Sequence, residues 1–240
     1  KEKSMNWLIT GGCGFIGISL IKTLMNENNH NIRVLDNLTT GTREDLLEVC
    51  TYSEKSVESI NKFNGIELVV GDILDEKLAV KVTKNADVII HLAANTGVGP
   101  SVENPRADCM ANVIGTFNYL EAARINSVQR FVFASSGAPA GEVEPPIHEE
   151  LPPHPVSPYG ASKLAGEGYC SAYFKTFNIQ TVMLRFGNVY GPGSLHKNSI
   201  VAKFIRQALN KETLEIYGDG AQIRDFIYID DLINALRLAV

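Results

Sequence analysis

Three glycines at every third position, between an apolar run and a helical pattern, constrain this 240-residue chain more than any other feature. Gly11, Gly14 and Gly17 follow the apolar run Trp7 to Thr10 and open a helix expected over Gly14 to Met25. A tight turn with close backbone packing requires residues without a Cβ atom. Because a helix N-terminus presents N–H groups and a partial positive charge, this spacing predicts a turn that holds a pyrophosphate. A glycine-rich turn that binds nothing is the alternative.

Strand-like and helix-like segments alternate after this turn. Further strands are expected over 32–35, 67–70, 87–92, 129–134 and 180–186, and further helices over 106–125 and 159–176. Unbroken apolar strands such as 87–92 are typical of a sheet covered on both faces, and hence of parallel strands. We therefore predict an α/β fold: a doubly wound, Rossmann-like parallel sheet in residues 1–186, then a smaller C-terminal substrate-binding portion in residues 187–240.

Two segments interrupt this alternation. Thr42 to Asn64 is polar and weakly periodic, which indicates a surface helix or an irregular excursion. Pro139 to Pro158 holds seven of the ten prolines, which excludes a regular element and predicts a long loop.

Composition narrows the classes of function. The formal net charge is −5 and no basic block stands out, so neither nucleic acid nor a membrane surface is an expected partner. The apolar stretches are too short to span a bilayer, and the first residues lack the apolar core of a signal peptide. The four cysteines are scattered, which argues against a disulfide framework or a zinc ribbon and predicts a cytoplasmic protein.

Asp36 stands at the expected end of the second strand, 19 residues beyond Gly17. A carboxylate at this place accepts hydrogen bonds from the ribose hydroxyls of adenosine and repels a 2′-phosphate, which favours NAD over NADP. An ordinary strand-end aspartate in a turn is the alternative, and the nearby Arg43 leaves the choice of cofactor open.

Tyr159 and Lys163 are four residues apart at the start of an expected helix, directly after the proline-rich loop. Residues at this spacing share one helix face, so the ammonium stands beside the phenol. A free phenol has a pKa of about 10, and a neighbouring cation favours its ionised form. The pair is therefore a candidate for base catalysis, and a solvated helix face is the alternative interpretation.

With these residues placed, the chain resembles the extended short-chain dehydrogenase/reductase family, specifically its NAD-dependent nucleotide-sugar epimerases and dehydratases. The matching stretches run in order over nearly the whole chain. They are Leu8 to Gly17, Leu35 to Leu38, Gly71 to Ile73, His91 to Ala94, Asn112 to Thr116, Phe133 to Ser136, Pro158 to Lys163, Leu184 to Pro192, Gly218 to Gly220 and Arg224 to Phe226.

The resemblance implies roles for individual residues. Ser136, Tyr159 and Lys163 would be catalytic, with Ser136 also contacting the sugar and Ser135 the less favoured of the two serines. A serine that satisfies strand-end backbone groups is the alternative for Ser136. The cofactor would contact Gly11, Gly14, Phe15, Ile16, Gly17, Asp36, Asn37, Thr40, Gly41, Asp72, Ile73, Leu92, Ala93, Ala94, Asn112, Tyr159, Lys163, Phe186 and Val189.

The resemblance also implies substrate contacts at Asn188, Ile200, Tyr217 and Arg224. For Arg224 an ion pair with Asp230 or Asp231 is the structural alternative. The histidines and glutamates of the proline-rich loop lack a second cluster, so we expect no metal site.

Within the family, the residues after the active hydroxyl separate the reactions. The 4,6-dehydratases carry Asp-Glu where this chain has Gly137 and Ala138, which favours epimerisation of a UDP-hexose or UDP-uronate at C4 through a 4-keto intermediate. An NAD-dependent dehydratase or reductase, and a non-catalytic NAD-binding module, remain as alternatives. Pro139 to Gly141 and Thr96 depart from the family pattern, which leaves the sugar open.

Relatives in this family are commonly homodimers, here through the helices expected over 106–125 and 159–176. The last residues, Leu232 to Val240, have the pattern of a helix in progress, and the family's substrate portion continues further. We therefore expect the sequence to be a fragment that lacks part of the sugar pocket.

Overall fold

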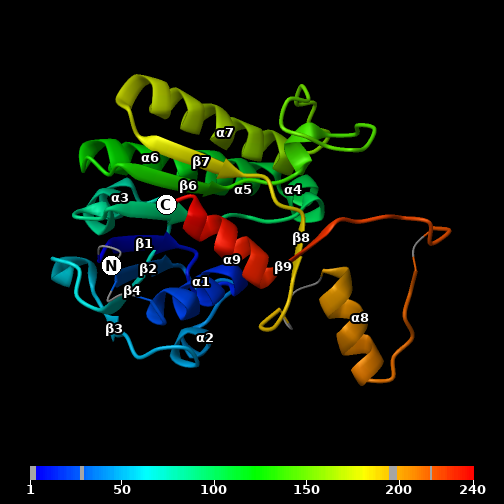
Figure 1. Cartoon of the computed structure of the whole chain (residues 1–240), viewed down its shortest axis with the longest axis horizontal. Coiled ribbons are helices and arrows are strands. Elements are labelled where there is room, and N and C mark those ends of the chain that lie inside the picture. The colour runs from blue at the N-terminus through cyan, green and yellow to red at the C-terminus, as the bar shows by residue number, and fades with distance from the viewer. Residues whose placement is uncertain (1–3, 28–29, 195–198, 217) are drawn as a thin grey trace.

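The computed structural model describes residues 4–27, 30–194, 199–216 and 218–240. Within them, seven strands form one parallel sheet in the order β3-β4-β2-β1-β5-β6-β7 (Figure 1). These strands are β1 (Asn6–Thr10), β2 (Asn31–Asp36), β3 (Ser53–Glu54), β4 (Ile66–Val70), β5 (Val88–His91), β6 (Arg130–Ala134) and β7 (Gln180–Leu184). The predicted doubly wound, Rossmann-like sheet is confirmed.

The helices are α1 (Phe15–Met25), α2 (Arg43–Leu47), α3 (Glu76–Thr83), α4 (Val98–Glu103), α5 (Pro105–Cys109), α6 (Gly115–Ile125), α7 (Pro158–Phe177), α8 (Ile200–Leu209) and α9 (Ile229–Leu238). A π-helical turn, Met110–Ile114, joins α5 to α6, and 3₁₀ turns lie at Val57–Ser59 and Ala138–Ala140. Two short strands, β8 (Asn188–Tyr190) and β9 (Phe226–Tyr228), pair in parallel outside the main sheet.

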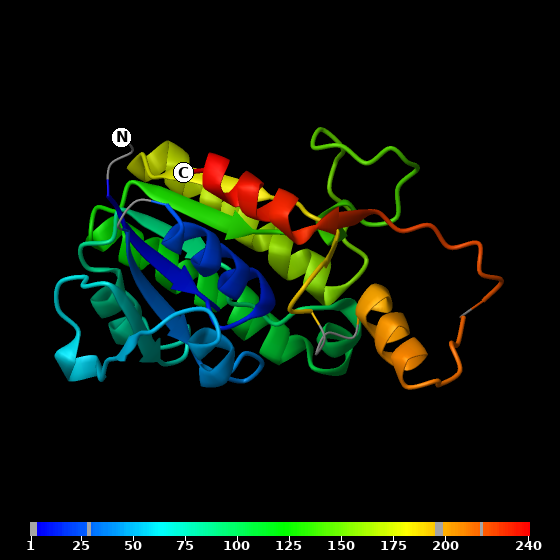
Figure 2. The same cartoon turned by 60° about the horizontal axis from the view of Figure 1, so that its bottom comes forward.

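The sheet is covered on both faces, which explains its unbroken apolar strands. Alternate residues of β1 point to opposite sides: Trp7 and Ile9 join a core under α1 and α9, while Leu8 joins a core under α3, α6 and α7. Figure 2 shows the sheet between these two helical layers. One buried ion pair, between Arg33 of β2 and Glu67 of β4, lies within the sheet at 2.8 Å.

The order of the strands fixes where a ligand can bind. β1 lies between β2 and β5, so the chain leaves the carboxyl ends of β1 and β5 in opposite directions. In open α/β sheets the crevice at such a switch point is the usual ligand site. The glycine turn after β1 and the loop after β5 meet here.

The sequence located most elements of the sheet and missed several short ones. It did not resolve α3 and α4, and the segment 42–64 contains α2, β3 and a 3₁₀ turn. The helix expected over 106–125 is present but is interrupted by the π turn. The proline-rich loop is closed at its base by a bridge between Gly141 and His154, and its tip projects from the body (Figure 2).

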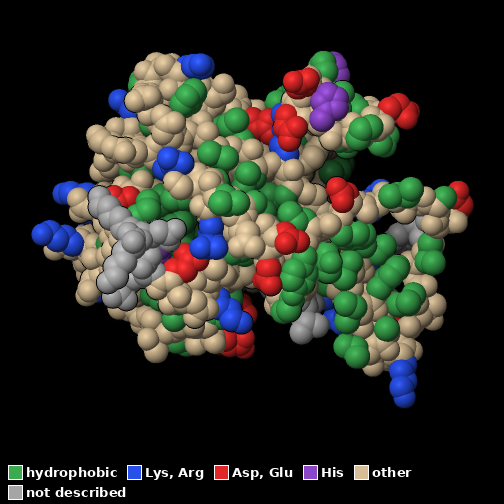
Figure 3. All heavy atoms as spheres, in the orientation of Figure 1, with side chains coloured by type: hydrophobic (Ala, Val, Ile, Leu, Met, Phe, Trp, Pro, Cys, Tyr) green, Lys and Arg blue, Asp and Glu red, His purple; other side chains and the backbone are tan. Residues whose placement is uncertain are grey.

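Of the residues after β7, α9 packs against the sheet, whereas α8 and its neighbouring segment project from it. Although the predicted boundary assigns α9 to the second portion, Ile229, Leu232 and Ile233 are buried in the core beside α1. By contrast, α8 and the strand-free segment after it project to one side (Figure 1), where apolar side chains gather on the surface (Figure 3). Leu209 and Ile223 there are 74% and 88% exposed. No helix in the described part of the chain is long and apolar enough to cross a membrane.

Candidate active site

A cavity of about 380 Å³ lies at the carboxyl ends of β1, β2, β4 and β5. This volume is within the range of cofactor sites, which is roughly 300–1,000 Å³. Many of the predicted cofactor residues line it: Gly11, Gly14, Phe15, Ile16, Gly17, Asp36, Asn37, Thr40, Gly41, Asp72, Ile73, Leu92, Ala93 and Ala94. The turns that follow separate strands therefore meet around one space.

The glycine turn cannot accept larger residues. Gly11 has φ +69°, and a Cβ atom there would lie 2.7 Å from the backbone nitrogen of Ala93. A Cβ atom on Gly17 would lie 2.5 Å from the Cα atom of Gly12, so α1 packs directly on the turn. Gly14 begins α1 without a side-chain cap, which suits a helix end that receives an anion.

Asp36 ties the end of β2 to the glycine turn. Its carboxylate oxygens accept hydrogen bonds from the backbone N–H groups of Cys13 and Leu38, both at 2.9 Å. Burial raises the pKa of the Asp36 carboxyl, and these two backbone hydrogen bonds act in the opposite direction. Each oxygen retains acceptor capacity toward the cavity that Asp36 lines.

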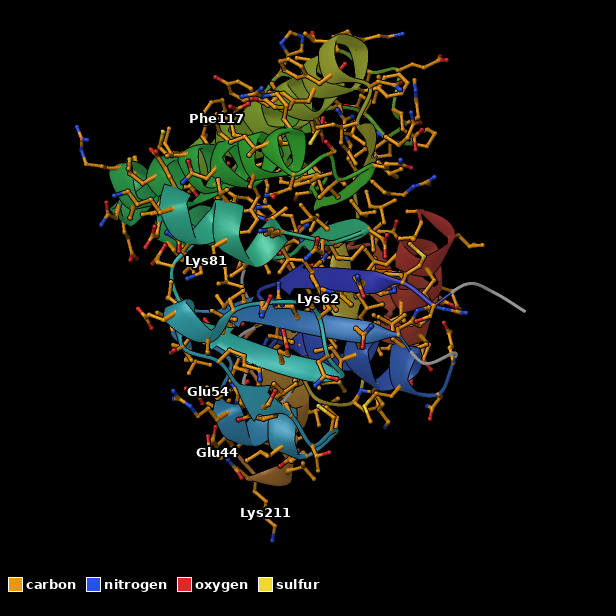
Figure 4. All side chains as sticks on the ribbon, turned by 90° about the vertical axis from the view of Figure 1, so that its left-hand side faces the viewer. Glu44, Glu54, Lys62, Lys81, Phe117 and Lys211 are labelled. Carbon is orange, nitrogen blue, oxygen red and sulfur yellow. The ribbon has the colours of Figure 1, made fainter. Side chains whose placement is uncertain are left out.

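Arg43 does not contribute to this cavity. Its guanidinium makes two hydrogen bonds of 2.9 Å to Glu54, a residue of the edge strand β3 (Figure 4). A cation engaged in this way is not available to a 2′-phosphate, so the local charge agrees with NAD as the cofactor.

Some lining residues escaped the sequence interpretation. Thr39, Leu74, Asn95, Thr96, Ala107, Met110 and Ala111 also face the cavity. Thr39 and Leu74 are neighbours of predicted contacts, and a wider window around each strand end would have included them. Ala107, Met110 and Ala111 come from α5 and the π turn, for which the sequence offers no comparable signal.

Five of the expected cofactor residues lie outside the lining of this cavity: Asn112, Tyr159, Lys163, Phe186 and Val189. The buried Asn112 side chain accepts a hydrogen bond from Asn95 N–H at 2.8 Å and donates one to the Asn95 carbonyl at 2.9 Å. Asn112 therefore holds in place the loop after β5, which contains Asn95 and lines the cavity. Phe186 lines a separate depression, and Val189 is buried in the core.

The three predicted catalytic residues meet at the end of β6. Lys163 is buried, and its Nζ donates to the carbonyl of Ala134 at 2.8 Å and lies 5.8 Å from the ring centre of Tyr159. A hydrogen bond with Ser136 acts on the Tyr159 hydroxyl. β6 pairs with β5, whose following loop lines the cavity, but the three residues are not themselves part of the lining.

The neighbouring Ser135 has a different role. Its hydroxyl donates to Glu167 at 2.5 Å, and the Glu167 carboxylate also accepts two hydrogen bonds from Arg185. Ser135 therefore connects β6 to α7 and β7, which leaves Ser136 as the hydroxyl beside the phenol.

The pKa of Tyr159 differs from the sequence-based expectation. Burial raises the pKa of this phenol, the hydrogen bond with Ser136 lowers it, and the charge of Asp108 raises it. Burial lowers the pKa of Lys163 to about 8, and here the charge of Asp108 opposes the effect of burial. Desolvation therefore outweighs the attraction between ammonium and phenolate that the i, i+4 spacing suggests.

His91, at the end of β5, is a structural residue. It is buried among Tyr119, Phe131 and Phe133, and its ring nitrogens lie 2.9 and 3.2 Å from the hydroxyls of Thr10 and Thr116. Burial, with the charge of Lys163, lowers its pKa to about 3.

The predicted substrate residues are partly brought together. The Asn188 side chain donates to the Asp225 carbonyl at 3.2 Å, next to Arg224. Arg224 is exposed and donates to the Ile223 carbonyl, and no ion pair joins it to Asp230 or Asp231 in the described chain. Ile200 is half exposed at the start of α8, and Tyr217 lies outside the described residues. Across residues 4–27, 30–194, 199–216 and 218–240 no cluster suited to a metal ion occurs.

This fold agrees with comparisons to known proteins. The family described as "NAD dependent epimerase/dehydratase family" matches residues 7–240. The UDP-glucose 4-epimerase of Mycolicibacterium smegmatis is 36% identical over 236 residues, which cover 96% of this chain and 72% of that protein. The chain therefore belongs to the NAD-dependent epimerase/dehydratase family, and its cofactor is NAD.

Two further relatives mark the range of the family. The crystal structure of Thermus thermophilus UDP-glucose 4-epimerase in complex with NAD is 35% identical, with a TM-score of 0.84 over 98% of this chain and 74% of that chain. A dTDP-glucose 4,6-dehydratase of Mycobacterium tuberculosis is 32% identical, over 97% of this chain and 68% of that protein. Both epimerases and dehydratases are thus similar to this chain.

The burial of Lys163 gives a prediction about stability. Lys163→Met keeps an aliphatic side chain and removes the titrating group, so it should abolish the part of the pH dependence of stability that this group gives. The pKa of Lys163 is about 8 in the folded protein, against 10.5 for a lysine in water. Because the folded pKa is the lower one, the unfolded chain binds the extra proton between these values, and the free energy of unfolding of the wild type should rise by about 3 kcal/mol relative to the Met variant as pH rises from 8 to 10.5.

Urea unfolding at a series of pH values measures this difference. The exposed Lys175, near the end of the same helix, provides the control Lys175→Met, which should leave the pH dependence unchanged. A wild type whose free energy of unfolding does not rise relative to that of Lys163→Met between pH 8 and pH 10.5 would contradict the interpretation.

Proposed function

We propose that this protein catalyses NAD-dependent epimerisation of a nucleotide sugar at C4, with a UDP-hexose or UDP-uronate as substrate and a transient 4-keto sugar as intermediate. The observation that carries this proposal is the meeting of Ser136, Tyr159 and Lys163 at the end of β6, the strand next to β5, whose following loop lines the cofactor cavity. The similarity to UDP-glucose 4-epimerases supports it.

Each side chain has a defined task in this reaction. Tyr159 takes the proton of the sugar 4-hydroxyl, and Ser136 holds that oxygen with a hydrogen bond. The ammonium of Lys163 stabilises the phenolate electrostatically from the same helix. NAD, when bound, supplies the hydride acceptor and a positive charge that favours the ionised phenol. When the keto sugar presents its other face, C4 would regain the hydride held by the reduced cofactor while Tyr159 returns the proton to the C4 oxygen, so the C4 configuration is inverted.

The residues after Ser136 favour epimerisation over dehydration. Elimination of water from the sugar requires an acid and a base near C5 and C6. This chain has Gly137 and Ala138 where the family's dehydratases carry carboxylates, and Ala138 opens a 3₁₀ turn with Pro139 and Ala140. A dehydratase or reductase is the second candidate, because dehydratases also lie among the relatives. A stable keto-sugar product or stoichiometric oxidation or reduction of the cofactor would identify it.

The substrate contacts follow from the arrangement of the chain beyond β7. We propose a cofactor-binding part in residues 1–186 and a substrate-binding part in residues 187–240. Asn188 and Arg224 would hold the diphosphate, since Arg224 is an exposed cation beside a strand that contacts Asn188. Ile200 and Tyr217 would lie near the base.

Epimerisation at C4 causes no net oxidation or reduction, so it should proceed without a supply of fresh cofactor, and this can be tested. The purified full-length protein should interconvert two C4 epimers without added NAD, as followed by NMR with UDP-glucose, UDP-N-acetylglucosamine and UDP-glucuronate in turn. Tyr159→Phe should lower the rate by about 100-fold to 10,000-fold, because it removes the general base. Tyr169→Phe, on the exposed part of the same helix, is the matched control and should retain activity.

Conversion of no UDP-sugar by the wild type would contradict the proposed epimerase. If the protein then binds NAD but exchanges no hydrogen at sugar C4, the alternative of a non-catalytic binding module applies.

We also infer a homodimer formed by α6 and α7. Phe117 of α6 packs edge-on against Tyr169 and Tyr173 of α7, and Tyr173 packs against Phe177 (Figure 4). Tyr169 and Phe177 are nevertheless 41% and 45% exposed. An aromatic surface of this kind is typical of protein interfaces.

A charge within this surface should separate the subunits. Tyr169→Glu is expected to shift the protein from dimer to monomer in sedimentation, because an unpaired carboxylate would be buried. Ser171→Glu adds the same charge at an exposed position on another side of α7 and should leave the dimer intact. A wild type that sediments as a monomer would contradict the inference.

A cytoplasmic location is the final part of the proposal. Three of the four cysteines, Cys13, Cys50 and Cys170, are buried as free thiols, and Cys109 is an exposed one. Free thiols suit a reducing compartment.

A further inference from the structure

Asp108, in the last turn of α5, is a buried carboxylate to which the reaction described above assigns no task. It is 2% exposed. One oxygen, Oδ1, accepts a hydrogen bond from the Asn112 side chain at 2.9 Å. The other, Oδ2, is buried and has no hydrogen-bond partner within the described chain. A buried carboxylate is costly unless a counter-charge compensates it, so its position requires a reason.

The hydrogen bond to Asn112 connects Asp108 with the cofactor cavity. Asn112 lies in the π turn, a type of turn that is frequent at functional sites. Its side-chain amide bonds both backbone groups of Asn95, which lines the cavity, and its nitrogen lies 3.1 Å from the Ser162 hydroxyl. Because an ionised carboxylate only accepts hydrogen bonds, Asp108 orients the NH₂ group of this amide. The oxygen of the amide is then directed to Asn95 N–H.

Asp108 also acts electrostatically on both titrating catalytic groups. Its charge raises the pKa of the Tyr159 phenol and opposes the lowering that burial imposes on the pKa of Lys163. No other carboxylate acts on these two residues in the described structure, and both effects operate where solvent screening is weak.

The other ionisable groups around this contact are accounted for. His91 of β5 has a pKa lowered to about 3, so it stays neutral at pH 7. Glu167 of α7 is engaged by Arg185 and Ser135. Glu103 of α4, and Arg106 and Cys109 of α5, are exposed. The π turn and the 3₁₀ turn that pack against these helices contain no ionisable residue.

We propose that Asp108 is a positioning residue of the active site. Its carboxylate anchors the Asn112 amide that holds the loop after β5, and its charge balances the buried ammonium of Lys163 and opposes ionisation of Tyr159. This inference rests on the proposed function, since Tyr159 and Lys163 are given their roles there.

The direction of both effects gives a diagnostic test. Asp108→Asn preserves the size of the side chain and an oxygen that can accept from Asn112, and it removes the charge. Without that charge the pKa of Lys163 and the pKa of Tyr159 both fall. Both limbs of the pH profile of kcat/KM should therefore move to lower pH, by about one pH unit. Loss of packing alone would lower the rate without moving either limb.

Two further variants separate charge from anchoring. Asp108→Ala removes the acceptor as well, so it should show the same shift together with a lower kcat. Glu103→Gln removes one exposed negative charge from the adjacent helix α4 and should leave both limbs in place. Thermal unfolding confirms that each variant is folded.

A second measurement does not depend on turnover. Ultraviolet difference titration against Tyr159→Phe reports the ionisation of the Tyr159 phenol, which should occur at lower pH in Asp108→Asn than in the wild type. Unchanged limbs and an unchanged phenol titration would overturn the proposal. Failure of the wild type to convert any nucleotide sugar would refute the proposed function instead, and the phenol titration would still decide the role of Asp108.

Discussion

The hydrogen bond between the Lys163 ammonium and the carbonyl of Ala134 is the contact on which the catalytic arrangement depends. It joins α7 to the end of β6 at 2.8 Å, in a place from which solvent is excluded. Because Ser136 follows Ala134 by two residues and Tyr159 precedes Lys163 by one helical turn, this single contact sets the position of the hydroxyl against the phenol. The bonds from Ser135 and Arg185 to Glu167 connect the same elements a second time.

Burial shifts the pKa values of both Lys163 and Tyr159 and makes their charged forms costly to hold in the folded protein. Desolvation disfavours both the ammonium of Lys163 and the phenolate of Tyr159, so each group gains from a partner of opposite charge. NAD, the cofactor of the family, carries positive charge in its oxidised nicotinamide, and Asp108 carries the negative charge that acts on the lysine. The proposed catalytic pair is therefore buried in its uncompensated form, and the charge of Asp108 acts on the pKa of both residues.

The parts of the molecule that could be predicted depend on local chemistry and on chain order. The turn at Gly11 and Gly17 requires glycine because any Cβ atom would collide with backbone, and this requirement is visible in the spacing alone. Tyr159 and Lys163 share a helix face whatever surrounds them. Parallel strands bring their carboxyl ends together, so Asp36, Asp72 and Ala93 could be expected around one cavity before any coordinates were known.

The parts that could not be predicted depend on contacts between distant residues. Nothing in the sequence marks the π turn that places Asn112 against Asn95, or the partner that engages Arg43. The raised pKa of Tyr159 follows from burial, which the i, i+4 spacing does not report. α3 was missed because it is only eight residues long, so its buried face of Leu78, Ala79 and Val82 spans too few turns to be recognised as a period. The projecting segment around α8 lacks the alternation of strand-like and helix-like stretches, so its structure could not be predicted from the sequence pattern.

The fate of the hydrogen at sugar C4 tests the central claim most directly. The protein would be incubated with UDP-glucose that carries deuterium at C4, in ordinary water, and the isolated sugar nucleotides would be examined by NMR and mass spectrometry. Direct transfer of hydride away from C4 and back within one closed site predicts that the inverted epimer retains the deuterium. Inversion with loss of the label to solvent, or label loss without any C4 epimer, would contradict the account.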